Sequence, residues 1–214
     1  MRAITLWAAA LVLGCAQSAA LAGAQLYEPL AASVQAALSK AVSDSAPLQS
    51  AFYSKVDEAN WLVAMSHRLD RRMRDYKTRI AFLKSVHYEA SRAGLDPQLV
   101  LGLIQVESGF KKYAVSRAGA RGYMQVMPFW VNLIGARNDD LFDMRKNIRY
   151  GCVILRHYLN LEHGDLFMAL GRYNGSRGKA AYPDAVLAAR KAWLVDRASE
   201  SFAKTNAKSG QALR

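Results

Sequence analysis

One carboxylate in the sequence stands where it could act as an acid. In a helix over residues 97–108, Glu107 shares a face with Val100, Leu103 and Ile104. A carboxyl group at the end of such an apolar stripe loses water, and its pKa rises because burial disfavours the charged form. A carboxylic acid that stays protonated near neutral pH can serve as a general acid. Helix position alone is equally consistent with a structural glutamate held by a local hydrogen bond.

The helix expected to carry Glu107 has recognisable ends. Asp96 is a favourable N-cap residue, and Pro97 suits the first helical position because the N–H of that position has no partner within a helix. Gly109 follows the last turn as a stop signal. The residues between are apolar on nearly all sides, which predicts a central, buried helix.

The flanking sequence predicts more helices and one irregular segment. Residues 110–128 contain Gly119, Gly122 and Pro128, which favour a long loop or a short hairpin. No strong strand pattern occurs elsewhere, so the chain is expected to be mainly α-helical. Helical periodicity predicts helices over residues 57–69, 80–90, 147–159, 165–173 and 183–193, and the alanine-rich residues 24–60 predict extra N-terminal helices.

Five short motifs follow one another in a familiar order. They are residues 107–110 (ESGF), 122–128 (GYMQVMP), 147–158 (NIRYGCVILRHY), 169–175 (ALGRYNG) and 182–186 (YPDAV). Over about residues 80–195 the chain therefore resembles the soluble lytic transglycosylases, the SLT domain of the lysozyme-like superfamily. Each motif alone is weak, but five in this order at matching spacings form a specific pattern.

This resemblance implies a mainly α fold of the α+β lysozyme-like type, in which a short loop or hairpin completes a helical catalytic domain. It implies that Glu107 is the catalytic acid and base. It further implies a set of substrate-binding residues around that carboxyl: Ser108, Met124, Gln125, Tyr173, Asn174 and Tyr182. The sequence departs from the family at two positions, where leucine is usual at Tyr123 and alanine is common at Arg172.

The implied reaction needs only one carboxylate, whereas ordinary glycoside hydrolysis uses two. The other acids near the motifs look more like helix N-caps and loop acids, namely Asp139, Asp140, Asp143, Asp165 and Asp184. In the implied reaction, Glu107 protonates the oxygen between N-acetylmuramic acid and N-acetylglucosamine. It then removes the proton of the 6-hydroxyl of the muramoyl sugar. Ring closure leaves a 1,6-anhydro end and consumes no water.

The N-terminus predicts export. Arg2 precedes an apolar run of eleven residues, Ala3–Leu13, and small residues then lead to cleavage candidates near Ala22. Residues 1–22 are expected to be a signal peptide and the mature protein periplasmic. In the alternative, residues 12–15 act as a lipobox, so that the signal ends at residue 14 and a lipidated Cys15 attaches the protein to the outer membrane.

Three regions are expected to follow the signal. They are an N-terminal helical region over residues 23–79, the lysozyme-like transglycosylase domain over 80–195 and a polar C-terminal tail over 196–214. A dense basic run at residues 67–79 is either a solvated helix face or an electrostatic guide for an anionic polymer.

Charge and composition limit the classes of molecule that the protein is expected to bind. Removal of residues 1–22 lowers the formal charge of +12 by one, and a basic exported protein suits the carboxylates of peptidoglycan glycan strands and their stem peptides. Export, and the lack of a basic patch interleaved with aromatics, argue against nucleic acid. The four histidines form no metal signature and no phosphate loop occurs, so neither metal nor cofactor is expected. Cys152 is expected to be a buried free thiol.

Three rival functions remain open. A lysozyme-like peptidoglycan hydrolase would use the same fold and acid. A non-catalytic wall-binding or scaffold protein of an envelope machine would not need Glu107 and Gln125, whose retention argues against that class. A basic helical module at a membrane surface would rest on residues 67–79.

Overall fold

The structure is a computed structural model in which residues 25–43, 52 and 54–194 are described. The expected signal peptide, Cys15 and the tail at 196–214 lie outside the described residues. The described part contains eight helices: α1 (Ala32–Ser43), α2 (Lys55–Leu69), α3 (Tyr76–Arg92), α4 (Pro97–Ser108), α5 (Phe129–Ile134), α6 (Met144–Leu161), α7 (Leu166–Tyr173) and α8 (Ala181–Lys191). The mainly helical prediction is thus confirmed, and among these residues no helix is both long and apolar enough to cross a membrane.

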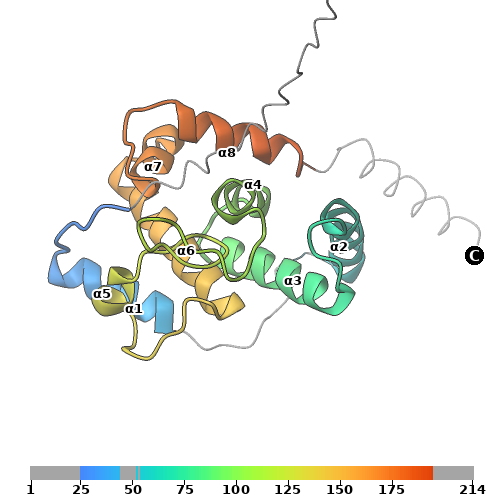
Figure 1. Cartoon of the computed structure of the whole chain (residues 1–214), viewed down its shortest axis with the longest axis horizontal. Coiled ribbons are helices and arrows are strands. Elements are labelled where there is room, and N and C mark those ends of the chain that lie inside the picture. The colour runs from blue at the N-terminus through green and yellow to red at the C-terminus, as the bar shows by residue number, and fades with distance from the viewer. Residues whose placement is uncertain (1–24, 44–51, 53, 195–214) are drawn as a thin grey trace, which may run out of the picture.

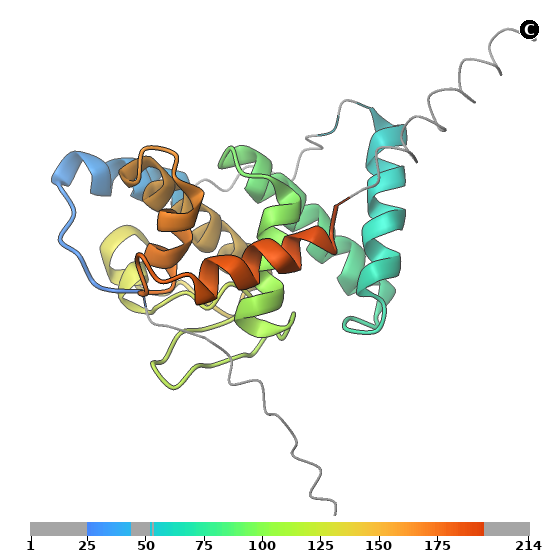
Figure 2. The same ribbon diagram turned by 90° about the horizontal axis from the view of Figure 1, so that it is seen from above.

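The helix α4 occupies the middle of the molecule, where α3 and α8 pack against it (Figure 1). Its ends are those predicted: the Asp96 side chain accepts a hydrogen bond from the backbone N–H of Gln98, and Gly109 is left-handed with φ 56°. Seen from above, α8 crosses α4 at a steep angle (Figure 2). This approach requires Gly102, because a Cβ there would come within 2.7 Å of the backbone nitrogen of Arg190.

The remaining helices form a shell around this centre. The helix α6 packs against α3 and α7, while α2 covers α3 and the pair α1 and α5 lies at the opposite end of the molecule (Figure 1). The helix α5 was not expected, because six residues are too few to show a helical period.

The loop at residues 110–128 is a compact segment with the rudiments of a hairpin. Two isolated antiparallel bridges pair Val115 with Arg121 and Arg121 with Val126. The backbone groups of Arg121 and Val126 exchange two hydrogen bonds, of 2.9 and 3.0 Å. Short pairing of this kind agrees with the expectation of a loop or a short hairpin.

A buried carboxylate joins three of the helices. The side chain of Glu89, on α3, is fully buried and forms ion pairs with Arg145 and Arg149 of α6 at 3.0 Å and with Arg92 at 3.1 Å. Arg92 and Arg149 also donate to backbone carbonyls in the last turn of α1. The cluster therefore fixes the end of α1 against α3 and α6.

Glu89→Ala should strongly destabilise the fold, because it leaves arginine side chains buried without their counter-charge. The expected loss in the free energy of unfolding is about 3–5 kcal/mol, as for other broken buried pairs. Glu58→Ala is the matched control, since Glu58 pairs at 3.3 Å with the half-exposed Lys84 and should cost about 1 kcal/mol or less. Urea unfolding of both variants measures the difference; equal losses would contradict the role given to Glu89.

Cys152 is a buried free thiol, as predicted. It is 1% exposed, and burial raises the pKa of the thiol, so very little reactive thiolate forms.

In a Cys15→Ser background, the Cys152 thiol should react with a thiol reagent only as fast as the protein unfolds. Denaturant should speed the labelling by orders of magnitude, and a small aromatic disulfide reagent followed by absorbance provides the measurement. Stoichiometric labelling within seconds in buffer would show that this face of α6 is open.

Candidate active site

The carboxyl of Glu107 is enclosed at the end of α4. The residue is 6% exposed, and burial raises the pKa of its carboxyl to about 8. The hydroxyl of Tyr182 donates a hydrogen bond of 2.5 Å to its Oε1, which acts in the opposite direction by favouring the carboxylate. Desolvation is the larger effect, so Glu107 is protonated at neutral pH and can donate a proton.

Tyr182 reaches Glu107 because α8 packs closely on α4. Its side chain is 1% exposed, and its pKa is raised well above the usual value by burial and by the nearby Glu107. The phenol therefore stays a proton donor across the working pH range. When Glu107 loses its proton, this hydroxyl is in place to stabilise the carboxylate.

The loop beside Glu107 is held by Asn147 of α6. The Oδ1 of this fully buried residue accepts from the backbone N–H of Met124 at 2.8 Å, and its Nδ2 donates to the carbonyls of Arg121 and Leu141. Gly122 is left-handed, with φ 76°, and a Cβ there would lie 2.6 Å from the Leu141 carbonyl oxygen. Only glycine fits this close approach of loop and helix.

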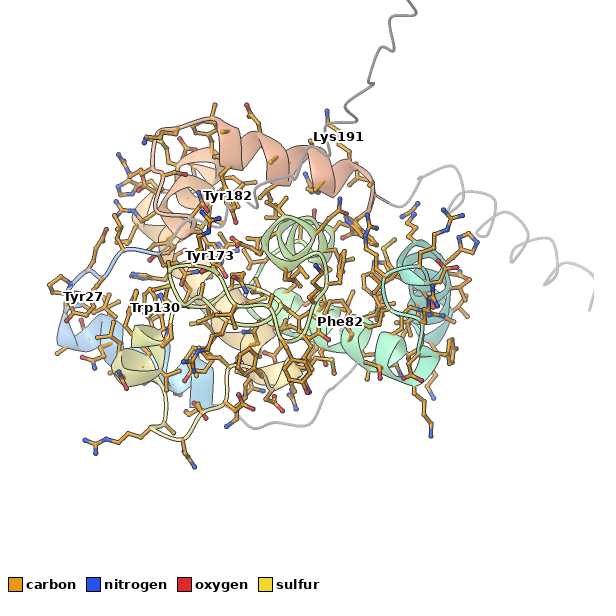
Figure 3. All side chains as sticks on the ribbon, in the orientation of Figure 1. Tyr27, Phe82, Trp130, Tyr173, Tyr182 and Lys191 are labelled. Carbon is orange, nitrogen blue, oxygen red and sulfur yellow. The ribbon has the colours of Figure 1, made fainter. Side chains whose placement is uncertain are left out.

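Two further hydrogen bonds tie the same loop to neighbouring helices. The hydroxyl of Ser108, on α4, donates to the Tyr123 carbonyl at 2.7 Å. The hydroxyl of Tyr173, at the end of α7, donates to the Met124 carbonyl at 2.7 Å. In Figure 3 the labelled Tyr173 and Tyr182 lie one above the other between α7, α8 and α4. The loop thus has fixed contacts with α4, α6 and α7.

The side chains of Met124 and Gln125 are both turned into the protein. Met124 is fully buried against Gly151, where a Cβ would collide with its sulfur. Gln125 is left-handed, with φ 48°, and its amide donates to the carbonyls of Gly122 and Ala114 at 2.9 and 3.1 Å. A non-glycine residue in this conformation is strained and persists only where its surroundings hold it.

The expected site residues therefore come together in part. All seven are buried, and direct hydrogen bonds join Glu107 to Tyr182, Ser108 to the loop and Tyr173 to the loop. Asn174 lies just past α7, where its amide donates to the hydroxyl of Ser176.

The other candidate acids have local structural partners. Asp143 and Asp165 are the N-caps of α6 and α7, and Asp140 accepts from the Phe142 backbone. Asp139 accepts from Tyr150 at 2.7 Å, and Asp184 lies in the first turn of α8. Within residues 25–43, 52 and 54–194, no group of three or more His, Cys, Asp or Glu side chains could hold a metal ion.

One residue at the site was missed by sequence reasoning. Gln25 lies far from every motif in the chain, yet its side-chain amide contacts the loop at Gln125 and Met127. The helical pattern expected over residues 24–60 gives no sign of this contact, and in the structure Gln25 lies in the non-helical segment before α1.

Known proteins resemble part of the chain. A transglycosylase of Enterobacteria phage PRD1 is 36% identical over 91 residues, which cover 42% of this chain and 33% of the phage protein. The membrane-bound lytic murein transglycosylase C of Actinobacillus pleuropneumoniae is 38% identical over 92 residues, covering 42% and 24%. The chain thus matches only a third or less of the length of these relatives.

A solved structure also matches. An inactive mutant of the lytic transglycosylase Slt from Pseudomonas aeruginosa aligns with a TM-score of 0.42 and 18% identity, over 81% of this chain and 36% of that one.

The family model of the transglycosylase SLT domain matches residues 84–191, which are just over half of the chain. Glu107, the Asn147-held loop and both tyrosines lie inside these bounds. The protein belongs to the transglycosylase SLT domain family.

Proposed function

We propose that this protein is a peptidoglycan lytic transglycosylase that cleaves the β-1,4 bond between N-acetylmuramic acid and N-acetylglucosamine. One observation carries the proposal: within the SLT domain, the carboxyl of Glu107 is buried at the end of α4 beside the Tyr182 hydroxyl, and burial raises its pKa to about 8. The names of the phage and Actinobacillus relatives support the same reaction class.

In the proposed reaction, protonated Glu107 donates its proton to the glycosidic oxygen while the bond from that oxygen to C1 of the muramoyl sugar breaks. The acetamido oxygen of the same sugar supports the positive centre. The Glu107 carboxylate, stabilised by the Tyr182 hydroxyl, then takes the proton of the sugar's 6-hydroxyl. At the same time the oxygen of that 6-hydroxyl forms a bond to C1 of the same sugar. The acid is regenerated, and the product carries a 1,6-anhydro end.

We assign substrate binding to the groups around this carboxyl. These groups are Ser108, Met124, Gln125, Tyr173, Asn174 and Tyr182, of which Ser108 and Tyr173 hydrogen-bond to the loop and Tyr182 to Glu107. The proposed mature protein is exported and basic, which suits an anionic polymer in the periplasm or, with a lipidated Cys15, at the outer membrane.

Glu107→Gln should abolish release of product from purified sacculi while the protein stays folded, because the amide matches the carboxyl in size but cannot exchange the proton. The expected loss is at least about 10²–10⁴-fold. Glu58→Gln, on α2 and outside the SLT match, is the control and should retain full activity.

Mass spectrometry of the products separates the proposal from its rivals. Anhydro ends are about 18 Da lighter than the hydrolysed equivalent, because no water is added across the bond. Reducing ends instead would identify a hydrolase. Release of no product by the wild-type protein would favour a wall-binding or scaffold role.

Tyr182→Phe should move the alkaline limb of the pH–activity profile to higher pH. The acid form of Glu107 is present below its pKa of about 8, so kcat/KM falls as pH rises through that value. The Tyr182 hydrogen bond lowers this pKa, and its removal therefore raises it further.

Tyr150→Phe is the matched control for this shift. It also removes a buried phenol–carboxylate hydrogen bond, to Asp139, but away from Glu107. Its alkaline limb should stay at the wild-type position. A limb that does not move in Tyr182→Phe would contradict the assignment of that limb to Glu107.

A further inference from the structure

The segment before α1 buries a polar side chain and exposes its apolar neighbours. Gln25 is 4% exposed, whereas Leu26 and Tyr27 are 60% and 61% exposed. Burial of an amide costs free energy unless its hydrogen bonds are made, so this reversal of the usual pattern indicates specific contacts. These residues lie outside the SLT match at 84–191.

The Gln25 amide bridges two backbone groups of the active-site loop. Its Nε2 donates to the Gln125 carbonyl at 3.2 Å, and its Oε1 accepts from the Met127 N–H at 3.0 Å. The amide also reaches Tyr173: burial raises the pKa of that phenol, and a hydrogen bond from Gln25 acts in the opposite direction. One side chain thus connects the strained Gln125 to the end of α7.

Two anchors keep the segment in this position. The carboxylate of Glu28 pairs with Arg172 of α7 at 2.6 Å, and the ring of Tyr27 packs edge-on against Phe129 of α5 at 5.7 Å. Arg172 is one of the two positions where the sequence departs from the family. Arg172 also pairs with Glu162 at 2.7 Å, so this arginine links the segment at Glu28, which lies outside the SLT match, to a carboxylate inside it.

We propose that Gln25 is a positioning residue of the active site, which holds the Gln125–Met127 backbone and the Tyr173 hydroxyl in register beside Glu107. The inference rests on the proposed lytic transglycosylase reaction and extends the site beyond the SLT domain. Gln25 acts through the loop and takes no part in proton transfer.

The test compares Gln25→Ala and Gln25→Glu with wild type in the exported, full-length protein. Gln25→Glu keeps the size and the acceptor for Met127 but loses the donor to the Gln125 carbonyl. Gln35→Ala is the matched control, because Gln35 also donates its amide to a backbone carbonyl, that of Leu133, on an exposed face of α1. Steady-state kinetics on soluble glycan strands and thermal unfolding are measured for each protein.

Both Gln25 variants should lose roughly tenfold or more in kcat with KM changed by less than about twofold, because misplacement of reacting groups by about 1 Å costs up to 10²-fold. Both Gln25 variants should remain folded at the assay temperature even if the melting temperature falls by several degrees, and Gln35→Ala should behave as wild type.

Four results would overturn the proposal. Unchanged kcat in active protein removes the role of Gln25 while leaving the proposed function intact. A rise in activity shows that the segment blocks the site instead of ordering it. A loss of kcat that follows an equal loss of stability, in both Gln25→Ala and Gln35→Ala, shows general destabilisation. Absence of anhydro products from wild type defeats the proposed function itself, and the role of Gln25 with it.

Discussion

The loop at residues 110–128, beside Glu107, depends on one side chain, the fully buried amide of Asn147. This amide satisfies three backbone groups, those of Met124, Arg121 and Leu141, which would otherwise be buried without partners. Each such unsatisfied group costs about 1–3 kcal/mol. The loop is therefore stable in one conformation, and that conformation brings Tyr123 and Met124 to their partners on α4 and α7.

Packing of helices sets the chemistry of Glu107. The close contact of α4 with α8 at Gly102 lets α8 cover the last turn of α4. It also places the Tyr182 hydroxyl within hydrogen-bond distance of the Glu107 carboxyl. The same burial that stabilises the helix pair raises the pKa of the acid. The packing of α4 against α8 therefore belongs both to the hydrophobic core and to the site. Loosening this helix contact would lower the pKa of Glu107 toward that of an exposed carboxyl group.

Local features of the structure followed from the sequence, because their causes are local. The ends of α4 were predicted from Asp96, Pro97 and Gly109, whose capping preferences act within a few residues. Burial of Glu107 followed from helix periodicity. The irregular conformation of the loop followed in outline from its glycines.

Features that depend on contacts between residues far apart in the sequence could not be predicted from the sequence. The three arginines around Glu89 come from two helices, and nothing in their spacing shows that they share one carboxylate. The inward turn of Gln125 depends on carbonyls that only the folded loop brings near it. Tyr182 was expected at Glu107 from the family pattern alone, since 75 residues separate the two.

The contacts of Gln25 and Glu28 also set an order of assembly. Gln25 pairs with groups 100 and 102 residues further along the chain, and Glu28 with one 144 residues away. Contacts of such long range form slowly, because loop-closure entropy must be overcome before they contribute. The helical body can collapse through its neighbouring helices first. This segment near the N-terminus is then among the last to reach its place, and the loop beside Glu107 gains its contacts with Gln25 only at that late step.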